Sequence, residues 1–201
     1  MRQSGNDGVE RFHATSGRVS GWLTVVTAAA TAVVGGLYLD DGFPDWVIAA
    51  AVLVGVLAWA AMLRPALWVR DDHLVMRNML ETIHIRLVAV EELAVRQVLA
   101  VRAADRRWVS TAIGRSLRRT LGSSRRATTG TDGKPATSVK YVDFVEERIR
   151  LLVDDARKSA AIRPGSPDQL ALTDAVRRER AWVPIVVITV AGVALVVTVL
   201  L

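Results

Sequence analysis

Three long runs of apolar residues dominate the hydropathy pattern of this 201-residue chain. The first, Trp22 to Leu39, and the second, Trp46 to Leu63, each contain 18 residues without a charge, and the third, Ala181 to Leu201, contains 21. A stretch of about 20 apolar residues is long enough to cross the hydrocarbon core of a bilayer as a helix. The pattern therefore predicts membrane-spanning helices over 19–39, 46–63 and 181–201.

Basic residues are distributed unevenly around these runs. The tail 1–18 has three arginines and two acids, the loop 40–45 has three acids and no base, and the segment 64–180 has 23 basic and 15 acidic residues. Segments rich in Lys and Arg next to a span stay in the cytoplasm. We therefore expect a multi-pass plasma-membrane protein whose tail and 64–180 segment are cytoplasmic, and whose loop and C-terminus are external. A cleaved signal peptide is the alternative interpretation of the first run, although 18 apolar residues are long for one.

Small residues form regular faces on the first two predicted spans. Ala28, Ala32 and Gly36 recur at every fourth position, as do Ala51 and Gly55. This spacing lets membrane helices approach closely, so it predicts contacts within the chain, in a homo-oligomer or with another membrane protein. Alanine-rich helices without such a role are the alternative. No ionisable residue lies inside any run, which disfavours transport of ions or charged substrates.

Short alternating stretches predict an antiparallel sheet in the first part of the 64–160 segment. The candidate strands are 67–70, 74–78, 82–87, 93–102 and 107–112. Between 82 and 87, three apolar residues alternate with Thr82, His84 and Arg86. We therefore expect one face of this strand to pack in the core and the other to be exposed to solvent. Turn-forming residues at 71–73 and 103–106 separate the strands.

A helical pattern follows after residue 138. From 138 to 160 an apolar stripe contains Val142, Val145, Ile149, Leu152, Val153 and Ala156. We expect this helix to pack on the sheet. Within the connecting segment 161–180, Ser166 to Gln169 has the capping residues of a short helix that would lead to the third run. The predicted fold class is an α+β membrane protein with three transmembrane helices and a small antiparallel sheet domain closed by a helix.

The order of these features resembles that of bacterial pleckstrin-homology-like (PH-like) membrane proteins of the actinobacterial type. The residues that carry the resemblance are two apolar runs, then Arg64-Pro65, then Asp72 with Leu74-Val75-Met76-Arg77-Asn78, and the helix from Tyr141 to Val153. The resemblance covers roughly residues 20–155 and implies a bent antiparallel sheet that binds protein partners or the membrane surface. The chain departs from the family in its five predicted strands, where seven are usual, in an arginine-rich insertion and in its third run. A complete sheet would need the 113–137 region or a second copy.

The insertion is a basic loop at 115–137 that has no acid before Asp132. Its arginines are Arg115, Arg118, Arg119, Arg125 and Arg126. An arginine near an anionic leaflet contributes about 1 kcal/mol, so we predict contact with anionic lipid headgroups. Retention for membrane orientation alone is the alternative. Thr120 and Thr128 are candidate phosphorylation sites that would weaken this contact. Nucleic acid is a disfavoured partner, because the loop contains no aromatic residue to stack on bases.

The sequence contains no recognisable catalytic or metal-binding pattern. There is no cysteine, and His13, His73 and His84 have no second ligand at metal spacing. Gly133-Lys134 lacks the flanking residues of a phosphate-binding loop. We therefore expect no enzymatic activity, metal or cofactor. The predicted function is a membrane-anchored scaffold that binds a protein partner and anionic lipid, and the alternative is an accessory subunit of a larger membrane complex.

Overall fold

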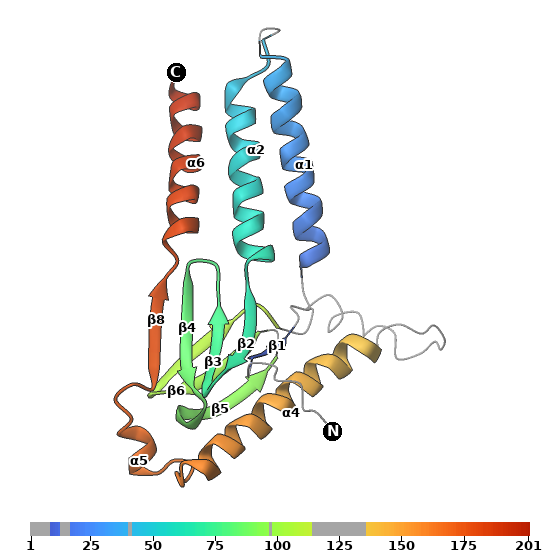
Figure 1. Ribbon diagram of the computed structural model, residues 1–201. Helices are drawn as coiled ribbons and strands as arrows, with labels where there is room; N and C mark the ends of the chain where they lie inside the picture. Colours follow the sequence, from blue (N-terminus) through green and yellow to red (C-terminus); the bar gives the residue numbers. More distant parts are fainter. Residues whose placement is uncertain (1–8, 13–16, 40–41, 97, 114–135) are drawn as a thin grey trace, which may run out of the picture. The chain divides into compact units, whose positions relative to one another are not determined.

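The computed structural model describes residues 9–12, 17–39, 42–96, 98–113 and 136–201, and in the last range it describes side chains from Tyr141 onward. These residues form two compact units (Figure 1). One unit contains the strands and a long amphipathic helix, and the other contains three apolar helices together with the segment Met79–Glu81. The fold is α+β with antiparallel sheets, which confirms the predicted class at that level.

The three apolar runs form helices that are long and apolar enough to cross a membrane. They are α1 (Arg18–Leu37), α2 (Asp45–Ala58) with its π-helical continuation η1 (Trp59–Leu63), and α6 (Trp182–Leu200). Helix α2 packs against both α1 and α6 (Figure 1). Most of the valine and leucine side chains on the three helices are exposed, as expected of helices surrounded by lipid.

The larger sheet has five strands. Their spatial order is β1 (Val9–Phe12), β2 (Ala66–Arg70), β3 (His73–Arg77), β4 (Glu81–Arg86) and β8 (Val176–Arg180). The pairs β1–β2, β2–β3 and β3–β4 are antiparallel. The predicted turn between β2 and β3 is present, and Asp71 adopts a φ of 52° there, which aspartate tolerates better than most residues.

The second sheet has three antiparallel strands in chain order, β5 (Val90–Val95), β6 (Leu99–Ala103) and β7 (Arg106–Ser110). The 3-10 turn η2 (Leu87–Ala89) joins it to β4. Ala104 and Asp105, both with positive φ, make the predicted tight turn between β6 and β7. The predicted single strand 93–102 is wrong, because the chain reverses after Val95 and forms β5 and β6. That stretch is apolar on both sides of the reversal and contains no Gly or Pro to mark it.

Helix α4 (Ala136–Ser159) packs on the sheets through the predicted stripe. Val142, Val145, Ile149 and Val153 are buried against core residues of both sheets, and Leu152 and Ala156 are partly buried. A fully buried Val or Ile side chain contributes about 1.5–3 kcal/mol, so the stripe is a main source of stability for this unit.

Two strands lie in segments for which the sequence predicts no strand. β1 is part of the predicted tail 1–18, and β8 occupies the connecting segment after the short helix α5 (Pro167–Leu170). Ser166 caps α5 as predicted, accepting a 3.3 Å hydrogen bond from the Gln169 amide. The two strands that were not predicted therefore come from the two ends of the unit that contains the sheets, which we call the soluble unit. Residues 114–135, in which a missing strand was sought, lie outside the described residues.

Candidate functional site

The five arginines of the predicted basic loop, Arg115, Arg118, Arg119, Arg125 and Arg126, lie outside the described residues, as do Thr120 and Thr128. The described chain approaches this segment from two buried residues, Ala112 and Ile113, and leaves it at the start of α4. Contact between these arginines and lipid stays a prediction.

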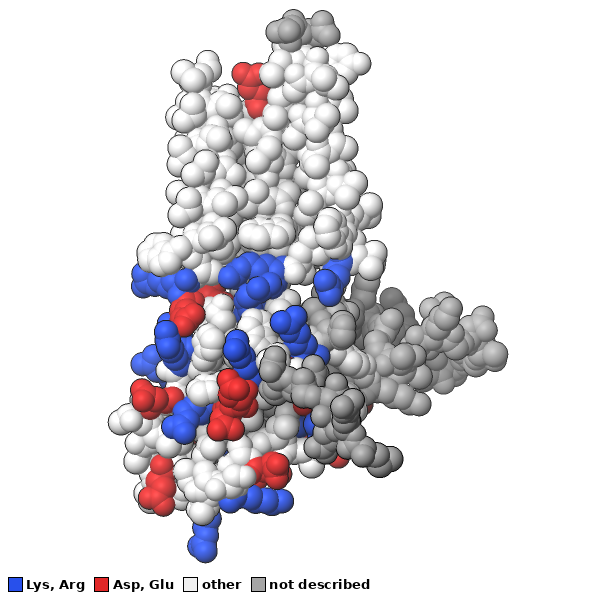
Figure 2. Space-filling view, viewed as in Figure 1, with Lys and Arg blue, Asp and Glu red and all other residues white. Residues whose placement is uncertain are grey.

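The three-helix unit has opposite charges at its two ends. Arg18 begins α1, Arg64 follows η1 and Arg180 precedes α6, whereas Asp45 begins α2 at the other end. Figure 2 shows the helices as a largely white surface with blue side chains at one end and red at the other. This is the charge asymmetry that orients helices in a membrane.

The basic end of the three-helix unit also holds the tip of the β3–β4 hairpin. The Arg64 guanidinium donates a 2.7 Å hydrogen bond from Nη1 to the Met79 carbonyl, and the Ala181 amide donates one of 2.9 Å to the Leu80 carbonyl. Arg64 directly follows the π-helical turn η1, and its backbone amide donates a 3.0 Å hydrogen bond to the Trp59 carbonyl. One short segment thus connects the ends of η1 and α6.

Four of the five predicted small packing residues line one apolar groove of about 310 Å³ between α1 and α2. They are Ala28, Ala32, Ala51 and Gly55. A Cβ placed on Gly55 would lie 3.2 Å from the Ala28 Cβ, so these two residues are in close contact. Gly36, the fifth, is exposed and a Cβ there would have no neighbour within 4 Å.

The buried positions of α1 are Gly21, Ala28 and Gly35. A Cβ on Gly21 would approach the Met62 Cβ to 2.8 Å, and one on Gly35 would approach Ile48 Cγ1 to 2.7 Å. Neither glycine belongs to the four-residue pattern of small residues from which the packing residues were predicted. The seven-residue spacing of these three positions is the signal that identifies them, since it keeps one side of a helix facing its neighbour.

The soluble unit contains an open cavity of about 640 Å³ between the C-terminal half of α4 and the β1, β2 and η2 region. Its walls combine apolar residues such as Val69, Leu87 and Leu152 with carboxylates. The acidic residues are Glu10, Asp71, Asp72 and Asp155, and Arg86 is the one basic residue among those that line it. The cavity is large enough for several side chains of a partner protein.

Glu10 connects β1 to α4 at the wall of this cavity. Its carboxylate accepts hydrogen bonds from Arg148 Nε at 2.9 and 3.2 Å. The hydrogen bond and the charge of Glu10 raise the pKa of Arg148 above its ordinary value. Both side chains are partly exposed, so the pair holds β1 in place with only a modest energy.

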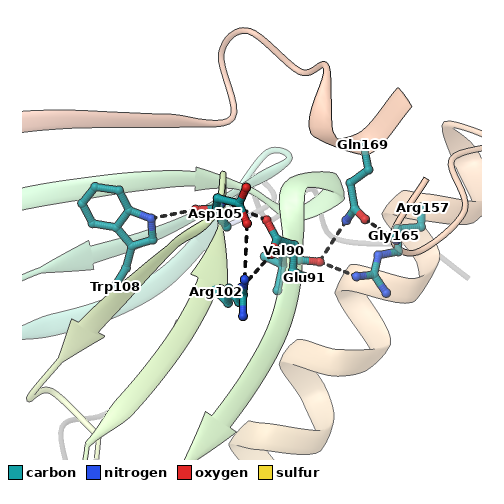
Figure 3. A network of polar contacts seen from close by, with 9 residues as sticks. Val90, Glu91, Arg102, Asp105, Trp108, Arg157, Gly165 and Gln169 are labelled. Carbon is teal, nitrogen blue, oxygen red and sulfur yellow. Dashed lines mark hydrogen bonds and ion pairs between the residues drawn. The ribbon is translucent and has the colours of Figure 1, made fainter. Parts of the chain in front are cut away.

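A network of polar contacts, shown in Figure 3, fixes the start of β5. The buried Gln169 amide donates from Nε2 to the Val88 and Val90 carbonyls at 2.8 and 3.1 Å and accepts from the Gly165 amide at 2.8 Å. Arg157 Nη2 of α4 also donates to the Val90 carbonyl. These bonds satisfy backbone groups at the free edge of β5, which is a structural role.

The same network continues on the exposed side of β5 and β6. Arg102 Nε donates to Glu91 at 3.0 Å and its Nη2 donates to Asp105 at 3.3 Å. The hydrogen bond that Arg102 donates to Asp105, followed by the charge of Glu91, raises the pKa of Arg102. Trp108 Nε1 donates to the Ala103 carbonyl at 3.1 Å, so the β6–β7 turn is held on both sides.

Among the described residues, no group of three or more His, Asp or Glu side chains is arranged to hold a metal ion. His73 and His84 lie on adjacent strands, and the nearest carboxylate to His84 Nε2 is Glu179 at 3.7 Å. No protein-family model, curated protein or solved structure matches the chain.

Proposed function

We propose that this chain is a membrane-anchored interaction module, with a PH-like soluble unit that lies on the cytoplasmic face and binds a protein partner and anionic lipid headgroups. The module is a scaffold and carries out no catalysis. Two antiparallel sheets with a long amphipathic helix packed on them support the PH-like assignment.

The pairing of β1 with β2 is the observation that carries this proposal. β1 precedes α1, and β2 follows α2 and η1, yet Phe12 pairs with Leu67 and Val9 with Arg70 in one sheet. Two strands that exchange backbone hydrogen bonds must lie on the same side of a membrane. The α1–α2 hairpin would therefore leave that side and return to it. β8, which directly precedes α6, belongs to the same sheet, so α6 would start from that side too.

The charges of the three-helix unit favour the cytoplasm for that side. Arg18, Arg64 and Arg180 lie at the helix ends nearest in sequence to the strands, and Asp45 lies at the opposite end of α2. The 640 Å³ cavity, with its mixed apolar and charged walls, supports a role in protein binding.

The cysteine-free sequence allows a direct test of this topology. Single cysteines at Arg107, in β7, and at Leu201, the last residue, would be treated in intact cells with a membrane-impermeant maleimide. We expect labelling at residue 201 only, and labelling at both positions after the membrane is opened. Labelling at residue 107 in intact cells would contradict the proposed orientation.

Lipid binding needs a separate test in the full-length protein. A fluorophore on a cysteine at Ser123 would report quenching by spin-labelled lipid in nanodiscs with and without phosphatidylglycerol. We expect stronger quenching with phosphatidylglycerol, and loss of that difference when Arg115, Arg118, Arg119, Arg125 and Arg126 are replaced by glutamine. Equal quenching in both lipids would exclude lipid contact by the loop.

A second function, as an accessory subunit of a larger membrane complex, is favoured by the groove between α1 and α2. Ala28, Ala32, Ala51 and Gly55 leave about 310 Å³ of apolar space there, which a helix of another protein or of a second copy could fill. Purification in a mild detergent, followed by mass measurement of the intact particle, tests this function. A monodisperse monomer without other chains would contradict it.

A further inference from the structure

The outer face of the five-stranded sheet is strongly basic. The cross-strand register and the alternation of side chains place one set of residues opposite the core. Val9, Ala66 and Thr82 belong to this side of the sheet. We call its other members the basic sheet face, and they are Arg11, Trp68, Arg70, His73, Val75, Arg77, His84, Arg86, Arg177 and Glu179. Among the described residues this set has five arginines, two histidines and one carboxylate, that of Glu179, which lies 3.0 Å from Arg177 and 3.7 Å from His84.

Three of these residues form a row across adjacent strands. Arg70 of β2 is paired with His73 of β3, and His73 is paired with Arg86 of β4. Basic groups directly opposite one another weaken a sheet unless negative charge lies between or above them. The carboxylate of Asp71 lies 3.7 Å from Arg70, and Asp71 and Asp72 line the same cavity as Arg86. The Arg70 and Asp71 side chains are mostly exposed, so this ion pair screens the row only weakly.

The neighbouring row supplies an apolar centre. Arg11, Trp68, Val75 and His84 lie side by side on β1 to β4. Both Trp68 and Val75 are on the side of the sheet away from the core, but Val75 is only 2% exposed and is covered, so the half-buried Trp68 is the apolar residue that a partner can reach. Tryptophan and arginine are the residues most often found at the energetic centre of protein interfaces. A purely electrostatic lipid contact would not need an apolar centre within the basic face.

We propose that the basic sheet face is the docking surface for an acidic polypeptide segment of a partner protein. This names the partner class of the interaction module and rests on that proposed function. Adjacent strands lie about 4.8 Å apart, so the row from Arg70 to Arg86 extends over about 10 Å. A segment in the polyproline II conformation has three residues per turn and rises about 3.1 Å per residue, so acidic residues three positions apart lie on one side of it at about this spacing. An apolar residue between them would lie toward Trp68.

The experiment uses full-length protein in phosphatidylcholine nanodiscs, with an environment-sensitive fluorophore on a single cysteine at Thr82, which is on the outer side of β4. The probe is a synthetic twelve-residue peptide with glutamate at every third position and leucine between. We expect a saturable fluorescence change at Thr82 and none from the same fluorophore at Thr111. Replacing both Arg70 and Arg86 with glutamine should weaken binding at least ~10-fold, because charge-assisted hydrogen bonds to carboxylates are lost.

The matched control replaces Arg106 and Arg107, which are exposed on β7 of the other sheet, with glutamine. This removes the same charge and should change the affinity by less than ~2-fold, since long-range effects of surface charges are screened by salt. No saturable change at Thr82, or equal weakening by both double variants, would overturn the proposal. A saturable fluorescence change at Thr82 caused by phosphatidylglycerol or by a single-stranded oligonucleotide, added in place of the peptide, would also overturn the proposal. Failure of the cysteine-labelling test would instead contradict the topology and leave this binding result standing.

Discussion

The guanidinium of Arg64 and the carbonyl of Met79 form a 2.7 Å hydrogen bond that holds the β3–β4 hairpin tip at the end of the π-helical turn η1. The next residue, Leu80, accepts a bond from the Ala181 amide at the start of α6. The segment Met79–Glu81, which is the hairpin tip and the first residue of β4, thus belongs to the same compact unit as the helices. A displacement of η1 or α6 would act first on this tip.

Replacing Arg64 with alanine should therefore loosen the hairpin tip. A hydrogen bond from a charged donor is worth about 1.5–3 kcal/mol, so exchange of the Ala181 amide, which is bonded to the Leu80 carbonyl, should become about 10-fold faster or more. Hydrogen exchange followed by mass spectrometry measures this effect. Arg70→Ala, which breaks an exposed ion pair, should leave the same amide unchanged. Unchanged exchange in Arg64→Ala would show that the bond does not hold the tip.

Two neighbouring glycines offer a matched test of the α1–α2 contact. A Cβ on Gly35 would lie 2.7 Å from both Ile48 Cγ1 and Phe43 Cε1, whereas one on Gly36 would meet nothing within 4 Å. Gly35→Ala should destabilise the helix pair by about 1–3 kcal/mol through overpacking. Gly36→Ala should be neutral or slightly stabilising. Unfolding in increasing fractions of SDS gives the comparison, and equal midpoints for the two variants would contradict this packing.

Gln169 is the most consequential polar residue in the core of the soluble unit. It is 3% exposed and satisfies the carbonyls of Val88 and Val90. Gln169→Leu should destabilise this unit by about 1–3 kcal/mol, the cost of a buried carbonyl left without a partner, because the Val88 carbonyl loses its donor while the Val90 carbonyl keeps Arg157. Asp168→Asn, at an exposed neighbouring position, is the control. Chemical denaturation followed by tryptophan fluorescence measures both, and a loss below 1 kcal/mol would be inconsistent with this role.

The sequence predicts the helices and strands whose own apolar pattern is regular. It does not predict strands that form only because a distant part of the chain offers a strand to pair with. The three runs are apolar over their whole length, and the α4 stripe and the Ile83 and Ile85 strand each bury a regular face, so all of these elements can be identified from the sequence. β8 has the sequence VRRER, in which only Val176 packs against the core. Its strand conformation depends on an available edge of β4, which no local pattern reveals.

The residues of the candidate site also fall into those that a sequence pattern predicts and those that it does not. Four small residues that line the groove were predicted from their four-residue spacing, whereas Gly21 and Gly35, which contact Met62 and Ile48, follow a seven-residue spacing with Ala28. The basic sheet face was not predicted, because its members come from five strands and are adjacent only through the register. The arginines of the loop are close together in the sequence and can be recognised there. The residues of a cross-strand row are far apart in the sequence and can be recognised only from the strand register.

The Glu10–Arg148 pair should show a small coupling that does not depend on pH under neutral or mildly alkaline conditions. The raised pKa of Arg148 means that its stabilising contribution is complete below the ordinary arginine pKa and is lost only as pH rises through the higher folded value. Because arginine titrates above about 12, the coupling should be constant from about pH 7 to pH 10. A double-mutant cycle of Glu10→Gln and Arg148→Gln should give about 0.2–1 kcal/mol. A coupling that falls with pH across this range would contradict the prediction.

Phe12 provides the strongest test that β1 belongs to the sheet, since it is 6% exposed and packs in the core cluster opposite Leu67. Phe12→Ala should destabilise the soluble unit by about 3–5 kcal/mol, as expected for a buried phenylalanine. Arg11→Ala is the matched control, because its side chain points away from the core in the same strand and its loss should cost less than about 0.5 kcal/mol. Denaturation of the full-length protein in detergent, with hydrogen exchange at β2, separates the two variants. If Phe12→Ala leaves both the midpoint and the β2 amides unchanged, β1 does not pair with β2, and the argument that both ends of the α1–α2 hairpin lie on one side of the membrane loses its basis.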